Sequence, residues 1–150
     1  MAVSAAGHPR GAPDAQPLAR LALVGIGGGL GTLLRWSLES AYPAIPGSWP
    51  WATFVINLTG ALALGALLEG LAAAGPDTGR RRAVRLGVGT GVLGGYTTYS
   101  TFAVESVRLV GAGQGWLALG YALGSVLAGV ACAAAGSWLV RRLGTPGAGR

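Results

Sequence analysis

Gly94-Gly95-Tyr96-Thr97-Thr98-Tyr99-Ser100-Thr101-Phe102 is the most informative segment of this chain. It lies within residues 86–104, which carry no charge and are numerous enough to cross a bilayer as a helix. A membrane-spanning helix must satisfy its own backbone polar groups, and it gains nothing by presenting threonines to lipid. A glycine pair followed by clustered hydroxyls therefore predicts a helix that is broken at mid-membrane and lines an ion site or pathway.

Composition indicates a membrane protein throughout. Of the 150 residues, 51% are hydrophobic and 11% charged, and the mean hydropathy is +0.53. The 28 glycines would destabilise a soluble helical domain, but glycine is common in packed membrane helices. All 11 basic residues are arginines that flank apolar segments, and no basic face with interleaved aromatics points to nucleic acid. The single Cys132 excludes a disulfide framework within one chain.

Four apolar segments are each long enough to span the hydrocarbon core, and together they predict an all-α integral membrane protein. They cover residues 18–38, 50–73, 83–110 and 116–140, the third being the broken one. They form one four-helix transmembrane domain over residues 18–141. Residues 1–17 are expected to be a disordered tail because large apolar residues are scarce there, and residues 142–150 form a C-terminal tail.

The distribution of arginines predicts the orientation of the chain in the membrane. With four crossings, both termini and the link between the second and third segments share one side, which carries nine arginines. Only Arg35 and Arg108 lie toward the other side. By the positive-inside rule the protein is a multi-pass protein of the cell inner (plasma) membrane with both termini in the cytoplasm.

Each apolar segment carries a polar residue with both a functional and a structural interpretation. Asn57 is the only amide in the second segment, Tyr121 and Ser125 lie four residues apart in the fourth, and Arg35 lies near the end of the first. In the structural interpretation, Asn57 bonds a neighbouring helix, Ser125 bonds its own preceding carbonyl, and Arg35 extends to the membrane interface. Uncharged amide and hydroxyl donors suit an anion that is dehydrated but not trapped. Carbonyls freed between Gly94 and Thr97 would instead suit a cation.

Three motifs carry a resemblance to a known family. They are Gly27-Gly28-Gly29-Leu30-Gly31-Thr32-Leu33-Leu34-Arg35-Trp36, then Thr53-Phe54-Val55-Ile56-Asn57-Leu58-Thr59-Gly60, and the segment from Gly94 to Phe102 with Glu105. The chain resembles the Fluc (CrcB-type) fluoride ion channels over roughly residues 20–140. The third motif is the most specific of the three.

The resemblance implies a small four-helix subunit that pairs antiparallel, giving a dimer with two fluoride pores. It implies that the backbone carbonyls of Gly94 and Thr97 help to bind one structural sodium ion at the dimer centre. The implied pore residues are Arg35, Asn57, Thr98, Tyr99, Ser100, Thr101, Phe102, Tyr121 and Ser125. The chain departs from the family pattern at Tyr99, where phenylalanine is usual, and at Gly129, where a further hydroxyl would continue the track of the fourth helix.

The implied function is passive, selective export of fluoride, with fluoride, membrane lipid and a second subunit as partners. That subunit is a second copy or an oppositely oriented relative, and the arginine bias favours the heterodimer because it should fix one orientation. No nucleotide-binding motif, metal cluster or catalytic triad is visible, so we do not expect an enzyme. The rival hypotheses are a small four-helix drug/proton antiporter, which needs a carboxylate deep in a span, and a non-transporting membrane scaffold.

Overall fold

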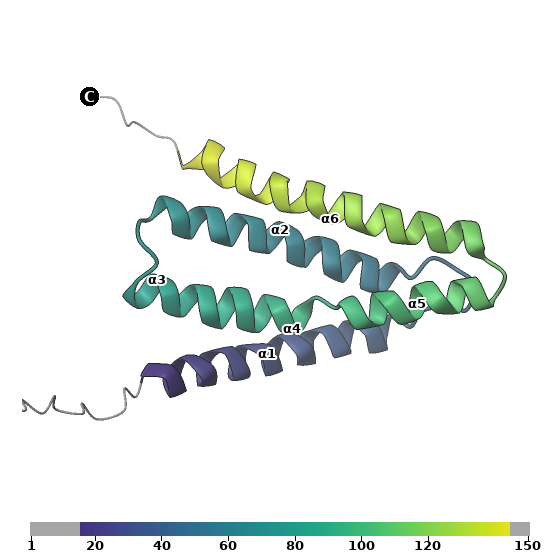
Figure 1. The fold of residues 1–150 in the computed structure, drawn as a ribbon, viewed down its shortest axis with the longest axis horizontal. Coiled ribbons are helices and arrows are strands. Elements are labelled where there is room, and N and C mark those ends of the chain that lie inside the picture. The colour runs from purple at the N-terminus through teal and green to yellow at the C-terminus, as the bar shows by residue number, and fades with distance from the viewer. Residues whose placement is uncertain (1–15, 145–150) are drawn as a thin grey trace, which may run out of the picture.

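The computed structural model describes residues 16–144 and shows an all-helical protein, as predicted (Figure 1). No strand occurs among these residues. The expected tails fall mostly on residues 1–15 and 145–150, which lie outside the described part of the chain. The elements are α1 (Gln16–Ala41), α2 (Trp51–Ala73), α3 (Gly79–Val84), the π-helix η1 (Arg85–Leu93), α4 (Gly94–Tyr96), α5 (Tyr99–Gly111) and α6 (Gly115–Leu143).

Three helices are long and apolar enough to cross a membrane: Pro17–Ala41, Trp51–Ala73 and Gly115–Leu143. They coincide with the first, second and fourth predicted segments, and they indicate a multi-pass membrane protein. Their large apolar side chains face outward, as Leu30 on α1 and Leu127 on α6 illustrate with 59% and 70% of their surfaces exposed. An outward apolar surface suits a lipid solvent, in which apolar side chains need no burial.

The third predicted segment is bent and interrupted, so it is not among the three long apolar helices. α3, η1 and α4 follow one another without a gap, and the chain then runs extended at Thr97 (φ −77°, ψ 156°) and Thr98 (φ −144°, ψ 126°) before α5 begins. The break therefore falls where the sequence predicts it. The π-helix over residues 85–93 was not predicted, and π-helical segments are rare and often occur at functional sites.

The helices pack as two pairs whose members alternate along the chain. α1 packs mainly against η1 and α4, and α2 packs mainly against α6. In Figure 1 the segment from α3 to α5 lies between α1 and α2, while α6 covers the far side of α2. Both pairs are therefore formed by segments that are not neighbours in sequence.

Glycines allow backbone to meet backbone in both pairs. A Cβ atom at Gly27 would overlap the carbonyl oxygen of Gly87, and one at Gly136 would overlap that of Leu62. Gly95, which the sequence assigns to the break, also belongs to this contact, because a Cβ there would overlap the Gly28 carbonyl. Gly94 makes no such close contact.

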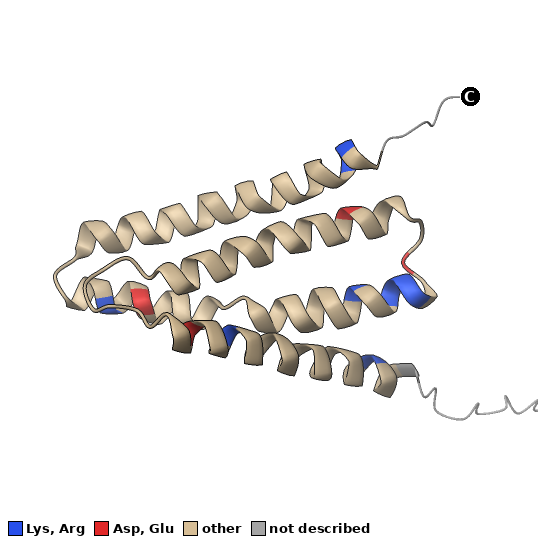
Figure 2. Cartoon of the chain, turned by 180° about the vertical axis from the view of Figure 1, so that it is seen from behind, with Lys and Arg blue, Asp and Glu red and all other residues tan. Residues whose placement is uncertain are grey.

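Charge is segregated along the bundle. Figure 2 shows the basic residues gathered mainly at the end where α1 begins and α6 ends, above all on α3 and in the last turn of α6. At this end the carboxylate of Asp77 accepts hydrogen bonds from Nε and Nη2 of Arg85, at 3.1 and 2.9 Å. These bonds lower the pKa of Asp77 from its ordinary value.

Candidate functional site: the helix break and its cavity

The break between α4 and α5 is held by one side chain from α2. Asn57 donates from Nδ2 to the Thr98 carbonyl at 2.9 Å, and the Thr98 N–H donates to Asn57 Oδ1 at 2.8 Å. The carboxamide thus pairs with the extended backbone of Thr98 as a neighbouring strand would. This pairing satisfies both polar groups of a residue that is 8% exposed, and it leaves the second Nδ2 proton of Asn57 for another acceptor.

Hydroxyl groups begin α5 directly after the break. Thr98 is the N-cap residue, and its Oγ1 accepts a hydrogen bond from the Thr101 N–H at 3.1 Å. The same Oγ1 lies 3.1 Å from Thr101 Oγ1 and 3.3 Å from Ser100 Oγ. The predicted hydroxyl cluster therefore has a local role, because it satisfies a donor that the helix start would otherwise leave unpaired.

The same hydrogen bonds release two carbonyls on the other side of the break. In a continuous helix the Gly94 carbonyl would accept from the N–H of Thr98, and the Thr97 carbonyl from that of Thr101. Both N–H groups donate elsewhere, to Asn57 Oδ1 and to Thr98 Oγ1. The chemistry of these two oxygens, neutral and carrying lone pairs, fits a hard cation such as sodium.

Arg35 reaches the break from α1. Its Nε donates to the Gly95 carbonyl at 3.2 Å, and its Nη1 lies 3.5 Å from Glu39 Oε2. The guanidinium thus satisfies a third carbonyl near the break and is half-buried between helices. It does not line the cavity described next.

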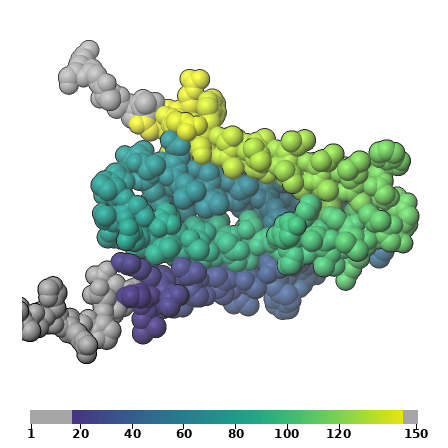
Figure 3. All heavy atoms as spheres, viewed as in Figure 1, coloured from purple at the N-terminus to yellow at the C-terminus, as the bar shows by residue number. Residues whose placement is uncertain are grey.

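A cavity of about 410 Å³ opens beside the break, between α2, α6 and the η1–α5 segment. Figure 3 shows a hollow between α2 and the segment from α4 to α5. Seven of the predicted site residues line this cavity: Asn57, Gly94, Thr97, Thr98, Tyr99, Phe102 and Ser125. The hydroxyl oxygen of Ser125 is buried and makes no hydrogen bond within the described residues. The cavity therefore presents uncharged donors and aromatic rings, with no acidic or basic side chain in its lining.

Tyr121 lies beyond the cavity wall and is fully buried. Its ring centroid is 5.2 Å from that of Phe102, which in turn lies 6.0 Å from that of Tyr99. The Tyr121 hydroxyl donates to Glu105 Oε2 at 2.7 Å, and Thr53 Oγ1 donates to Glu105 Oε1 at 2.8 Å. Three residues from α2, α5 and α6 thus form one buried hydrogen-bonded cluster.

Thr53 and Glu105 were not among the predicted site residues. Thr53 lies one turn before Asn57, and Glu105 shares a helical face with Tyr99 and Phe102, so the spacing carried a signal. The signal was incomplete because Thr53 and Glu105 are 52 residues apart, and only the packing of α2 against α5 brings them together.

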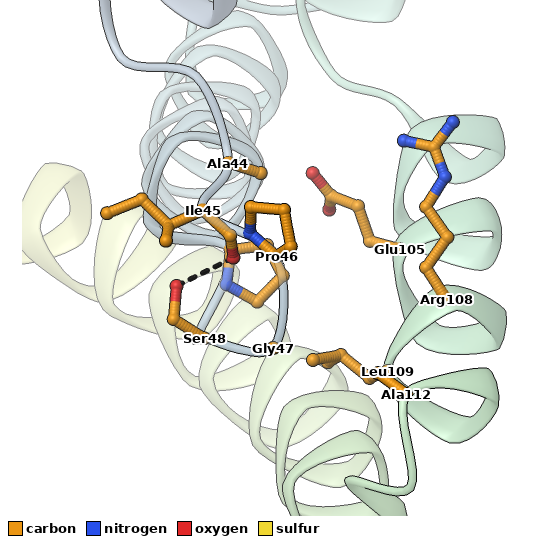
Figure 4. Close-up of a pocket in the computed structure, with 10 residues that line it drawn as sticks. Ala44, Ile45, Pro46, Gly47, Ser48, Glu105, Arg108, Leu109 and Ala112 are labelled. Carbon is orange, nitrogen blue, oxygen red and sulfur yellow. Dashed lines mark hydrogen bonds between the residues drawn. The ribbon is translucent and has the colours of Figure 1, made fainter.

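A second hollow of about 240 Å³ lies on the other side of Glu105. Figure 4 shows Glu105 and Arg108 on α5 facing the link that precedes α2, where Ala44, Ile45, Pro46 and Ser48 form the opposite wall. The hydroxyl of Ser48 donates to the Ile45 carbonyl at 2.8 Å and closes this turn. Glu105 therefore belongs to the buried cluster and also lines this hollow, at the end of the bundle that is poor in basic residues.

Comparison with known proteins identifies the family. Residues 22–137 match the model of the CrcB-like proteins, described as "CrcB-like protein, Camphor Resistance (CrcB)". The chain belongs to this family. It is 50% identical to the fluoride-specific ion channel FluC 1 of Cutibacterium acnes over 79% of this chain and 80% of that protein. It is 52% identical to FluC 2 of Leifsonia xyli subsp. xyli, over 75% and 82% of the two chains.

A third relative, the fluoride-specific ion channel FluC 2 of Nocardia farcinica, is 41% identical over 89% of this chain and 92% of its own. These relatives are ion channels and not enzymes, in agreement with the prediction for this chain. The matched region includes the break, the cavity and the Glu105 cluster.

Proposed function

We propose that this chain is a subunit of a fluoride-selective channel that exports cytoplasmic fluoride passively and lowers fluoride toxicity. The observation that carries the proposal is the cavity at the helix break, which offers Ser125 Oγ as a buried, unpartnered donor beside Asn57 and Phe102. The relatives named fluoride-specific ion channels support the choice of ion.

The geometry suits a small anion that must leave as easily as it enters. The second Nδ2 proton of Asn57 and the hydroxyl of Ser125 can replace water around fluoride, while ring edges of Phe102 and Tyr99 are electropositive. A lysine or arginine in the lining would hold the ion more strongly and slow its exit. An inside-negative potential favours exit of an anion by about 2.3 kcal/mol per ~100 mV. The Tyr121–Glu105–Thr53 cluster and the hollow of Figure 4 continue the route toward the other end.

The proposed topology has four crossings, with the broken segment from α3 to α5 as the third. Both described ends of the chain lie at the arginine-rich end of the bundle, and that end then faces the cytoplasm (Figure 2). The protein would reside in the plasma membrane.

A second subunit in antiparallel orientation completes the proposed pore. The cavity is open at its side, and Tyr99 beside it is 80% exposed in the single chain. The partner is a second copy or an oppositely oriented relative, and the arginine bias favours the relative. A tag on each terminus, probed with a reagent that cannot cross the membrane, reports the side on which the termini lie and so tests this. One gene product found equally in both orientations would exclude an obligate heterodimer.

A structural sodium ion at the dimer centre belongs to the same proposal. The carbonyls of Gly94 and Thr97 would hold it, and their helical donors are engaged elsewhere. The ion would neutralise the carbonyl dipoles that meet at the break.

Two phenylalanines make a matched test of the function, because the chain has only Phe54 and Phe102. Both pack against the core of Leu109, Ala118 and Tyr121, but only Phe102 lines the cavity. We expect liposomes containing the chain and its partner to release fluoride but not chloride. Phe102→Ile should abolish release, and Phe54→Ile should preserve it.

The rival functions give different results in the same assay. A non-transporting scaffold leaves fluoride resistance unchanged in Phe102→Ile. A drug/proton antiporter needs a carboxylate exposed deep in a span, whereas Glu105 is bonded to Thr53 and Tyr121 and Glu69 accepts from Arg141 at 2.7 Å. Fluoride release that requires a proton gradient would support the antiporter and refute a passive channel.

A further inference from the structure

The arginine-rich end of the bundle contains a groove that the channel function does not use. α1 and α3 diverge toward the end where α1 begins (Figure 1), and two hollows of about 400 and 530 Å³ lie between them. Arg20, Arg82 and Leu86 line both hollows and join them into one groove. The groove ends deeper in the bundle where Gly27 meets the backbone of Gly87.

Among residues 16–144, positive charge exceeds negative charge around α3. Arg80, Arg81, Arg82 and Arg85 gather there, and the carboxylate of Asp77 pairs with Arg82 and Arg85. Asp77 contacts Arg85 Nη2 at 2.9 Å and Arg82 only through Nε at 3.5 Å. Within residues 16–144 the terminal nitrogens of Arg82 donate no hydrogen bond, and its side chain is 42% exposed. Arg82 can therefore donate two parallel hydrogen bonds to a phosphate group.

The rest of the groove is apolar. Leu21 and Val24 on α1 line the larger hollow, Leu23 lines the smaller one, and Leu86 lines both. Leu21 is 69% exposed, and it lies one residue beyond Arg20 in the direction of the membrane interior. The groove thus combines cationic donors at its mouth with an apolar lining that continues inward.

We propose that this groove binds an anionic phospholipid, with its phosphodiester at the terminal nitrogens of Arg82 and an acyl chain along Leu21, Val24 and Leu86. Basic pockets between membrane helices on the cytoplasmic side recognise such headgroups. A soluble phosphate would use the arginines but would gain nothing from the leucines, so the apolar lining favours the lipid. The inference does not depend on which ion the channel conducts.

The test compares two arginines of α3 that differ in their relation to the groove. Arg82 lines it, and Arg80 lies two residues away at the same end without lining either hollow. The full chain is reconstituted in phosphatidylcholine vesicles with phosphatidylglycerol as the anionic component, extracted in detergent, and analysed by native mass spectrometry for bound lipid. We expect wild-type protein to retain phosphatidylglycerol selectively, and Arg82→Gln to weaken this retention about fivefold.

Arg80→Gln should leave retention near that of wild type, and Arg82→Lys should restore it only in part, because the charge returns without the two parallel donors. Equal losses in Arg82→Gln and Arg80→Gln would show diffuse attraction to the surface and overturn the site. Displacement of the lipid by inorganic phosphate would show a site for a soluble anion, and retention of phosphatidylcholine as strongly as phosphatidylglycerol would show no headgroup recognition. Either result would refute the proposal. A melting temperature for each variant separates loss of the site from loss of the fold.

Discussion

Replacing Asn57 should show whether its amide mainly stabilises the helix break or mainly binds the ion. Asn57→Leu keeps the approximate size of the side chain and removes both hydrogen bonds to Thr98, of 2.9 and 2.8 Å. The N–H and carbonyl of Thr98 then remain without partners on a residue that is 8% exposed. Each unsatisfied buried group costs about 1–3 kcal/mol, so the two together should destabilise the fold by about 2–6 kcal/mol.

Asn57→Asp separates the two bonds. Aspartate can still accept from the Thr98 N–H, but its second oxygen replaces the donor at 2.9 Å from the Thr98 carbonyl and repels it, so the loss should be at least as large as in Asn57→Leu. Thr59→Val is the matched control on the same helix, because it removes the exposed contact of Thr59 Oγ1 with Tyr96 OH at 3.0 Å and leaves the break untouched. Its cost should stay below about 1 kcal/mol.

The assays are thermal unfolding of the purified chain in detergent and fluoride release from liposomes. We expect wild type and Thr59→Val to have the highest melting temperatures, and Asn57→Leu and Asn57→Asp to have the lowest, with fluoride release lost in both Asn57 variants. Wild-type stability in Asn57→Leu, with release abolished, would refute the idea that the amide holds the break. It would assign Asn57 to the ion alone.

Two further predictions concern packing and charge. Gly136→Ala should destabilise the fold by about 1–3 kcal/mol and lower the melting temperature, because the new Cβ meets the Leu62 carbonyl and the backbone of α2 cannot move away easily. Gly129→Ala on the same helix is the control: its new Cβ has nothing within 4 Å, so the change should be neutral or slightly stabilising. Equal effects of the two variants would show that α2 and α6 are not in backbone contact. The Asp77–Arg85 contact should stabilise the fold above the unfolded-state pKa of aspartate, near ~3.9, and be lost as pH falls through the lower folded-state pKa. Asp77→Asn should therefore lower the melting temperature slightly at neutral pH and not at pH values below that pKa, and a difference that persists in acid would contradict the assignment.

Sequence reasoning located the helix break because its signal is local. A glycine pair and four hydroxyls within nine residues conflict with a lipid-facing helix whatever surrounds them. The apolar lengths of three helices are equally local, and the structure agrees with them. Seven of the predicted site residues line one cavity for the same reason, since five of them belong to the short segment 94–102.

What escaped prediction depends on contacts between distant segments. The pairing of Asn57 with Thr98 joins residues 41 apart, and nothing in the spacing shows that the amide binds backbone on both sides. The link of Thr53 to Tyr121 through Glu105 needs three helices to meet. The π-helix of residues 85–93 has no local signature beyond its glycines, and it lies where α1 presses against the backbone of η1.

The alternating pairing of the helices also constrains the order in which the protein can assemble during synthesis. α1 cannot pack against its partner until η1 has been made, and α2 cannot do so until α6 has been made. Until then the groups that hold the break have no fixed scaffold, because Asn57 lies on the helix that is still waiting. A nascent chain stalled before α6 would therefore present an unfinished third segment to the insertion machinery. The packing of α6 against α2 therefore completes the support of the helix that carries Asn57.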